Sequence, residues 1–490
     1  MTDLPDEQNY SFTPPRWKVA LILCLVALAL GSLVFFITCS ETLETWAAGE
    51  TDLWGDFRYD PPHDTNSKRL AASDLERVHR RLLPAWGIAL GSMLSRAPAE
   101  MQRLRASIKD PNLLDLAREL DRLASEDPAR HSKRIFYLLR AWNTYLDRNG
   151  QPWHVDGGVR LSPRAFLYLK VYRVVADMRV KVAGEPMRAR LLRRVDNTNV
   201  VELYLGSASQ HQDGAMVVVD RISEFAQNQL WPLLATPGKE AAPLSRFGPR
   251  VRAEARRELP PAAVTLLTRL APARAALVHG MREINAQARC GSRFRVLAIP
   301  HRGLSERARA TLWRVALRDA GSRCPAITAE GVQAMVAASD RLAAAPGLDA
   351  AVGALTAWVA RGVTVHESRH VADDARVNLE TSAPACEACP NDMDRATRAE
   401  LSAYLASFAA REVGYLNLMQ ACSAVAKSSG GANHNAIVAA ARALGAACAG
   451  AGPPTDLYAR AAALERKYFG RSDAIVLPAD FPATLKVAGL

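Results

Sequence analysis

The sequence predicts an α+β protein that is mainly α-helical, with an N-terminal transmembrane helix, a helical region, a small antiparallel β module and a mostly helical C-terminal domain. Three observations lead to this prediction. A long apolar run without charge lies near the N-terminus. Apolar residues return every three or four positions over most of the remaining chain, as in amphipathic helices. Between residues 151 and 235 that period falls to about two, as in strands.

Residues 19–39 form the apolar run (VALILCLVALALGSLVFFITC). As a helix, a run of this length crosses roughly 30 Å of hydrocarbon, so we expect a transmembrane span. Arg16 and Lys18 precede the span, whereas acidic residues follow it. The positive-inside rule therefore leaves residues 1–18 in the cytoplasm as a tail and sends everything after the span across the membrane. A cleaved signal peptide is the alternative interpretation of the same run.

We therefore expect a single-pass protein of the inner (cytoplasmic) membrane whose later domains are periplasmic or extracellular. Residues 55–150 are predicted to form a helical region, because their apolar residues follow the helical period. Residues 151–235 are predicted to form an α/β module with antiparallel strands at 166–175, 178–182, 187–192, 199–206 and 215–220 and a closing helix at 222–234. Pro, Gly and charge gather at 236–262, which we interpret as a linker. A mostly helical domain follows at 263–490, with a short β-like stretch at 293–299.

The chain carries 62 Lys and Arg against 50 Asp and Glu, a formal charge of +12. The basic residues are spread along the chain, which favours anionic surfaces as partners and argues against a nucleic-acid partner. Several arginines lie on the predicted strands, at Arg188, Arg190, Arg193 and Arg194. These side chains either bind an anionic envelope polymer or form a solvated face of the sheet.

Six cysteines lie beyond the apolar run and its edge, and an even number suits an oxidising compartment. Neighbours in sequence suggest three disulfides, which pair Cys290 with Cys324, Cys386 with Cys389, and Cys422 with Cys448. Spacing alone does not determine the pairing. The C-x-x-C at 386–389 could also supply half of a zinc site, but no second C-x-x-C completes it.

An H-E-x-x-H pattern occurs at residues 366–370, inside a predicted helix of the C-terminal domain. His366 and His370 are four residues apart, so on a helix their imidazoles project from one face and can bind one metal ion. Glu367 lies beside them and can reach a water on that ion. With only 10 histidines in the chain, composition alone produces the pattern on the order of once in a hundred proteins of this length. A salt-bridged surface helix with two incidental histidines is the alternative.

The H-E-x-x-H pattern is the signature of the zincin metallopeptidases, and residues 355–412 resemble their gluzincin branch. This resemblance implies a zincin-like C-terminal domain with Zn2+ as cofactor. In gluzincins the third ligand is a Glu on a second helix, antiparallel to the first. The helical stretch RAELSAYLASFAARE carries Glu400, our choice for this ligand. Glu412, about three turns further along the same predicted helix, is the next candidate, followed by His434 and Asp374.

Two residues depart from the gluzincin pattern. Thermolysin-like gluzincins have an Asp four residues after the second His and another four after the ligand Glu. Asp374 matches the first, but Tyr404 occupies the second position. Tyr404 could donate to the oxyanion of a tetrahedral intermediate, or it could be a core aromatic residue. Zincins usually carry an uncharged residue where this chain has Arg369, so we expect its side chain to turn toward solvent or toward Asp373.

A bound zinc ion lowers the pKa of its water to about 7, and we expect Glu367 to take that proton as general base and to pass it to the leaving amine. The resemblance implies a membrane-anchored zinc metallopeptidase acting on peptide bonds of envelope proteins or of peptidoglycan. The alternative is a non-catalytic envelope scaffold with a structural 366–370 helix. A purely structural zinc ion would require a fourth ligand, for which His434 is the only histidine left downstream. The sequence contains no P-loop, no G-x-G-x-x-G after a strand and no G-x-S-x-G, so those enzyme classes are set aside.

Overall fold

A computed structural model describes residues 72–91, 97–161, 165–195, 205–209, 214–234, 246–296, 298–376, 386, 388–389, 393–425, 430–445, 448 and 452–487. The structure is 64% helical, and its strands form a small mixed sheet. This confirms the prediction of a mainly helical fold class. The expected tail and the expected span at 19–39 lie outside the described residues.

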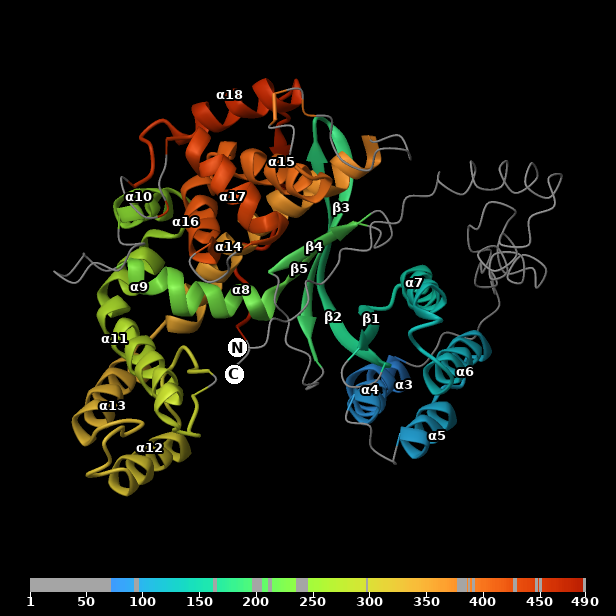
Figure 1. Ribbon diagram of the computed structural model, residues 1–490, viewed down its shortest axis with the longest axis horizontal. Helices are drawn as coiled ribbons and strands as arrows, with labels where there is room; N and C mark the ends of the chain where they lie inside the picture. Colours follow the sequence, from blue (N-terminus) through green and yellow to red (C-terminus); the bar gives the residue numbers. More distant parts are fainter. Residues whose placement is uncertain are drawn as a thin grey trace.

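Short helices form the N-terminal region, as the sequence predicts (Figure 1). They are α3 (Ala72–Arg77), η2 (Val78–Leu82), α4 (Leu83–Gly91), α5 (Ala97–Ser107), α6 (Pro111–Ser125) and α7 (Ser132–Arg148). Asp110 caps α6 by accepting a hydrogen bond from the Leu113 amide, and Pro111 occupies the first turn. Their apolar faces pack with the first strands of the sheet into a core of their own, which includes Trp86, Trp142 and Trp153.

The sheet contains β1 (Trp153–Leu161), β2 (Ala165–Val182), β3 (Glu185–Arg194), β4 (Gly206–Ser209) and β5 (Gly214–Val218), in the spatial order β1-β2-β3-β5-β4. A short strand near the C-terminus, β6 (Ile475–Val476), pairs with β2. The prediction of an antiparallel sheet is wrong in one place, because β3 and β5 run parallel. The two stretches expected at 166–175 and 178–182 form one long strand, and β1 is a strand that we did not predict.

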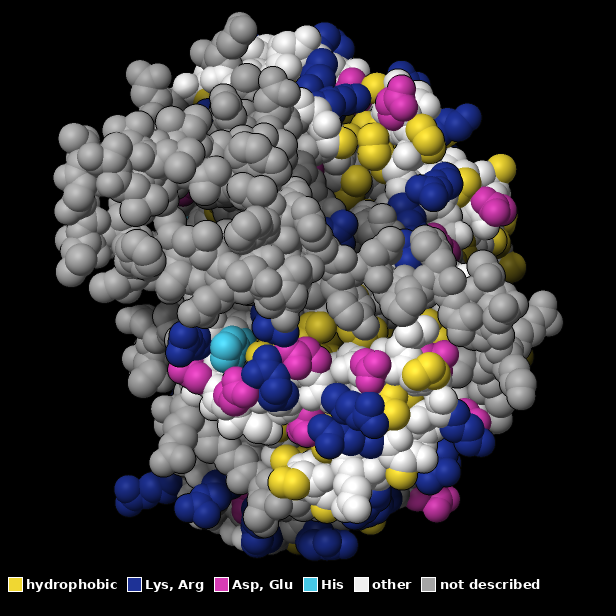
Figure 2. All heavy atoms as spheres, turned by 90° about the vertical axis from the view of Figure 1, so that its right-hand side faces the viewer, with side chains coloured by type: hydrophobic (Ala, Val, Ile, Leu, Met, Phe, Trp, Pro, Cys, Tyr) yellow, Lys and Arg dark blue, Asp and Glu magenta, His cyan; other side chains and the backbone are white. Residues whose placement is uncertain are grey.

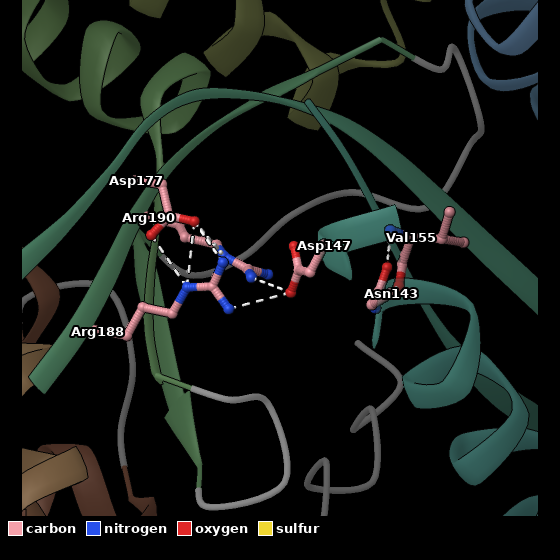
Figure 3. Close-up of polar contacts among 6 residues, drawn as sticks. All are labelled: Asn143, Asp147, Val155, Asp177, Arg188 and Arg190. Atoms are coloured by element: carbon pink, nitrogen blue, oxygen red, sulfur yellow. Dashed lines mark hydrogen bonds and ion pairs between the residues drawn. The ribbon is translucent and has the colours of Figure 1, made fainter. Parts of the chain in front are cut away.

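The helical region is attached to the sheet through polar contacts of α7 (Figure 3). Asn143 exchanges two hydrogen bonds of 2.8 Å with the backbone of Val155 on β1. Asp147, near the end of α7, forms ion pairs with Arg188 at 3.0 Å and with Arg190, both on β3. These contacts tie the two parts of the chain together.

The strand arginines are therefore not all available to an external anion. Arg190 is buried, and Asp177 on β2 forms ion pairs with both Arg190 and Arg188 (Figure 3). Arg193 donates to the backbone carbonyl of Lys486 near the C-terminus. Of the four arginines that we considered as a polymer-binding face, at least these three are occupied by partners within the chain.

A second and larger core spans the sheet and the C-terminal helices. These helices are α8 (Val219–Phe225), η4 (Ala226–Leu230), α9 (Trp231–Leu233), α10 (Gly248–Glu258), α11 (Pro261–Ala286), η6 (Gln287–Cys290), α12 (Glu306–Arg318), α13 (Ala329–Ala343), α14 (Leu348–Arg376), α15 (Arg395–Ala409), α16 (Gly414–Val425), α17 (Gly431–Ala443) and α18 (Leu457–Phe469). The three expected disulfides join Cys290 to Cys324, Cys386 to Cys389, and Cys422 to Cys448.

Three local predictions in this part of the chain are wrong. Residues 248–258, expected to belong to a linker, form α10, where the buried Glu254 accepts hydrogen bonds from backbone amides at the start of α16. The described residues of the β-like stretch 293–299 are irregular. The helix expected to continue through Glu412 ends at Ala409, because Ala410 adopts an extended backbone.

One described helix, α14, is long and apolar enough to cross a membrane by length and composition alone. However, 83% of its most apolar window is buried inside the protein, as in the core helix of a folded domain. It contacts strands β3, β4 and β5 on one side and helices α11, α15 and α16 on others. This central helix carries the H-E-x-x-H residues.

Candidate metal centre

The last third of α14 changes character from apolar to polar. From Leu348 to Val365 most residues are buried and apolar. His366 and His370 then follow one helical turn apart, and each side chain keeps 15% of its surface exposed. The apolar part of the helix anchors it in the core, so the two imidazoles are held on a rigid element at the edge of that core.

Glu400 reaches the two histidines from α15, which packs against α14. Asp394 caps the start of α15 by accepting from the Thr397 amide, and Glu400 follows in the second turn. Its Oε2 atom lies 3.4 Å from His366 Nε2 and 3.7 Å from His370 Nε2. The two Nε2 atoms are 3.2 Å apart. Three ligand atoms from two helices therefore form a nearly regular triangle.

The size of this triangle suits one metal ion. Zinc bound to imidazole or carboxylate at 2.0 to 2.1 Å in a tetrahedron separates its ligand atoms by about 3.3 Å. The three measured separations lie close to that value. Glu400 Oε2 is buried and has no hydrogen-bond partner, which is unusual for a carboxylate oxygen unless a cation completes its environment. Within the described chain, His366, His370 and Glu400 are the group that could hold a metal ion.

Electrostatics of the cluster point the same way. Burial lowers the pKa of His370, but the neighbouring Glu400 reverses the effect and raises it to about 9. Burial raises the pKa of Glu400, but the two histidines lower it well below its usual range. The carboxylate thus stays ionised and holds a proton on an imidazole beside it. A divalent cation can replace that proton, so metal binding at this cluster would release it.

Glu367 is the buried acidic neighbour of the cluster. Only 8% of its surface is exposed, and burial raises its pKa, although the positive charge shared by His366 and His370 opposes the shift. Its side chain lies against strand β4, where a methyl group added to Gly206 would come within 2.8 Å of Glu367 Oε1. Glycine is therefore required at position 206 by close packing, and it brings the backbone of β4 next to Glu367.

Tyr404, four residues after Glu400, packs its ring against His366, with centroids 4.6 Å apart. Its hydroxyl donates to Asn433 Oδ1 on α17 at 2.5 Å. Burial and the nearby carboxylates Glu400 and Glu367 raise the pKa of Tyr404 well above its ordinary value, so the phenol keeps its proton. The structure thus places Tyr404 beside a candidate ligand, with the hydroxyl engaged by Asn433.

Arg369, the departure within the H-E-x-x-H pattern, is completely buried. Of the two orientations that we considered, the one toward Asp373 is observed, with Arg369 Nε 2.9 Å from Asp373 Oδ1. Arg369 Nη1 also lies 2.9 Å from Glu465 Oε1 and 2.8 Å from Asp473 Oδ2. Ser402 on α15 accepts from Arg369 Nε at 3.0 Å. Arg369 therefore connects α14 to α15, to α18 and to the segment after α18.

The other candidate ligands are not part of the cluster. Glu412 is exposed in the turn after α15, and its backbone carbonyl accepts from Trp358 Nε1. His434 on α17 and Asp374 on α14 are absent from the group of converging ligand atoms. The described residues thus bring three candidate ligands together, one fewer than the closed set of four in a structural zinc site.

Sequence reasoning missed several residues that shape the site. Gly206 sits in a strand of small residues, Gly-Ser-Ala-Ser, and that composition is a sign of close backbone approach. Asn433 precedes the His434 that we considered, but nothing in its local pattern indicates a contact with Tyr404. Glu465 and Asp473 follow Arg369 by about a hundred residues, so only the folded chain relates them.

Comparisons with known proteins found no matching family model, no matching curated protein and no matching solved structure.

Proposed function

We propose that this protein is a zinc-dependent hydrolase that cleaves peptide bonds, with His366, His370 and Glu400 as metal ligands and Glu367 as general base. The observation that carries this proposal is the convergence of three ligand atoms at separations of 3.2, 3.4 and 3.7 Å, with a buried Glu400 oxygen that contacts both histidines but forms no regular hydrogen bond. Three ligands leave a fourth position open, as in catalytic rather than structural zinc sites.

A bound zinc ion would polarise the substrate carbonyl and make a water molecule acidic at neutral pH. Glu367 lies next to both ligand histidines and can take a proton from the attacking water. Its raised pKa, caused by burial, suits a carboxylate that accepts a proton and then donates it to the leaving amine. Tyr404 is the candidate for a hydrogen bond to the developing oxyanion, which requires its hydroxyl to turn from Asn433 toward the substrate.

A peptide substrate is supported by strand β4. It lies at the end of the strand order, and among the described residues it pairs with β5 alone. Such an edge can hydrogen-bond to an extended peptide added as a further strand. Because Gly206 brings β4 against Glu367, a peptide on this edge would pass close to the general base.

We further propose that the protein is a single-pass protein of the inner (cytoplasmic) membrane, held by residues 19–39, with its catalytic part on the periplasmic or extracellular side. Three disulfides in the described chain suit an oxidising compartment. Envelope proteins and peptidoglycan peptides are the peptide substrates of that compartment.

Metal analysis of the purified full-length chain tests the proposal most directly. We expect one zinc ion per chain in the parent and less than a tenth of that in the His366→Ala, His370→Ala double variant. His434→Ala is the matched control, because it removes a histidine outside the cluster, and it should keep the full zinc content. Equal zinc content in the parent and in the double variant would reject the site.

A second measurement separates an enzyme from a scaffold. Glu367→Gln should keep both the zinc and the melting temperature but lower the hydrolysis of a quenched fluorescent peptide library by roughly a hundredfold or more. Chelation of the parent should abolish the same activity, and added zinc should restore it. A zinc-loaded parent that hydrolyses no peptide, or a Glu367→Gln variant with full activity, would favour the non-catalytic scaffold instead.

A further inference from the structure

Helix α12 presents an unusual outer face. Trp313 and Leu317 are four residues apart, so they lie on the same face of the helix, with 37% and 72% of their surfaces exposed. Single exposed hydrophobic side chains are common on the surfaces of folded proteins. Here the two are neighbours on the outside of α12, the side that does not pack against α13.

The segment that contains α12 has a high net positive charge, because acidic residues are few in it. Residues 287–345 contain ten arginines and four acidic residues, so about half of the chain's net charge of +12 lies in 59 of its 490 residues. Arg307 and Arg314 on α12 are exposed and are seven residues apart, and Arg318 follows one turn later. On a helix these three arginines form a stripe beside Trp313 and Leu317.

Most of these cations have no acidic partner in the described chain. Arg318 contacts the adjacent Asp319, but no ion pair is formed by Arg307, Arg314 or Arg323. The N-terminal helices α3 to α7 differ from α12 in this respect. Figure 2 shows their side of the molecule, where basic and acidic side chains lie interspersed. There, exposed arginines pair with neighbouring carboxylates, as Arg118 does with Asp115 and as Arg122 does with Glu119 and Glu126.

A disulfide fixes the segments that flank α12. Cys290 and Cys324 are bonded, with Cα atoms 5.9 Å apart, so the chain before α12 and the chain after it are held side by side. Arg289 and Arg323 each stand next to one of these cysteines and are exposed. The basic surface is therefore built on a helix and a disulfide-linked turn rather than on a loose tail.

We propose that α12 docks on the surface of an anionic lipid bilayer, with Trp313 and Leu317 in the headgroup region and Arg307, Arg314 and Arg318 on lipid phosphates. A helix with exposed Trp and Leu beside a row of arginines is the usual form of an interfacial anchor. A purely ionic polymer would be bound by the arginines but would make no use of the two apolar side chains.

The place of α12 in the molecule fits this arrangement (Figure 1). Helices α12 and α13 lie at the lower end of the view, and α15 and α18 at the upper end. Docking through α12 would therefore keep the helix that carries Glu400 away from the bilayer. This inference rests on residues 287–345 and does not depend on the metal centre.

Photo-cross-linking tests the contact in the full-length chain. With Leu317→benzoylphenylalanine, reconstituted in nanodiscs that contain phosphatidylglycerol, we expect lipid adducts detectable by mass spectrometry. Replacing the lipid by phosphatidylcholine, or adding Arg307→Glu and Arg314→Glu, should lower the adduct yield at least fivefold. Arg118→Glu is the matched control, since it changes a paired arginine on α6, and it should leave the yield unchanged.

Equal yields in both lipids, or no adduct with phosphatidylglycerol, would overturn the proposal. So would adducts to added dextran sulfate in preference to lipid, because they would identify an anionic polymer as the partner. Circular dichroism of the charge-reversed variant verifies that α12 remains folded. Zinc content is measured in the same samples, so a failure of the metal centre is recognised separately from a failure of this contact.

Discussion

Two clusters of buried charge lie next to each other on α14, and they are completed in different ways. Around Arg369, the carboxylates of Asp373, Glu465 and Asp473 face a cation that the chain itself supplies, and Arg376 and Arg471 add two more at the rim. In this cluster the chain supplies both the carboxylates and the cations that neutralise them.

The metal cluster has no such fixed cation. Glu400 and Glu367 face two histidines, and the proton that Glu400 holds on the imidazole of His370 can be exchanged for a metal ion. In the first cluster an arginine neutralises the carboxylates. In the second cluster a metal ion from solution could neutralise them. We therefore distinguish a structural half, the cluster around Arg369, from a functional half, the cluster that we propose to bind a metal ion. Arg369 and the two histidines of these clusters all lie within residues 366–370 of α14.

The largest effect on stability is expected from removing the cation of the structural half. Arg369→Met removes the cation that three carboxylates share and leaves the buried Glu465 without its ion pair, so we expect a loss of about 3 to 5 kcal/mol in the free energy of unfolding, measured by urea denaturation. Arg361→Met is the control on the same helix. Arg361 is partly exposed and its ion pair with Glu258 is long, at 3.9 Å, so its loss should cost less than about 1 kcal/mol. A tolerated Arg369→Met would show that the structural half does not hold α14 in place.

Supplying the cation of the functional half should have a comparable effect in the opposite direction. At a zinc concentration a thousand times its dissociation constant, we expect the metal-free chain to gain about 4 kcal/mol of stability. Chelation should remove this gain. The His366→Ala, His370→Ala variant should show neither response, and an equal gain in that variant would place the zinc elsewhere.

A buried histidine in the N-terminal core provides a third comparison. His79 is completely buried, its Nδ1 lies 2.9 Å from the Leu75 carbonyl oxygen, and its Nε2 accepts from Trp142 Nε1 at 3.0 Å. Both ring nitrogens are thus satisfied by neutral groups. Burial lowers the pKa of His79 to about 4, whereas Glu400 raises that of His370 to about 9. Neither ring nitrogen of His79 is therefore left to bind a metal ion.

This contrast predicts a pH dependence of the N-terminal core. In the unfolded chain His79 takes up a proton near pH 6.5, but in the folded chain only near pH 4, so stability falls as the pH is lowered from 6.5 to 4. We expect His79 to contribute about 3 kcal/mol to that fall. In His79→Gln, urea denaturation between pH 6.5 and pH 4 should show a correspondingly flatter dependence than in the parent.

The sequence predicted the parts of the site that depend on local helical spacing. His366 and His370 are one turn apart on a predicted helix, and Glu400 lies on a second stretch that the sequence also predicts to be helical. Which face of that helix meets the histidines is decided by tertiary packing. The resemblance to gluzincins selected Glu400, and the structure brings it, rather than Glu412, to the histidines.

What could not be predicted depends on contacts between distant segments. The parallel pairing of β3 with β5 joins strands whose order no local pattern reveals, and β1 contains two glycines that weaken its strand signal. Helix α10 was hidden in a segment rich in Pro and charge, because its single buried stripe is narrow. The ion partners of Arg369 lie on α18 and beyond, so sequence spacing carried no information about them.

The smallest predicted effect tests whether the two halves of α14 act independently. Ser402, two residues after Glu400, accepts from Arg369 and donates to Asp373 at 2.6 Å. Ser402→Ala removes both hydrogen bonds but leaves the direct Arg369–Asp373 ion pair, so we expect a loss of about 1 to 2 kcal/mol in urea denaturation. If the structural half only supports the fold, the zinc dissociation constant, measured by competition with a chelating dye, should change less than about threefold. A tenfold weaker zinc affinity would instead show that Ser402 positions Glu400, and that the two halves form one coupled network.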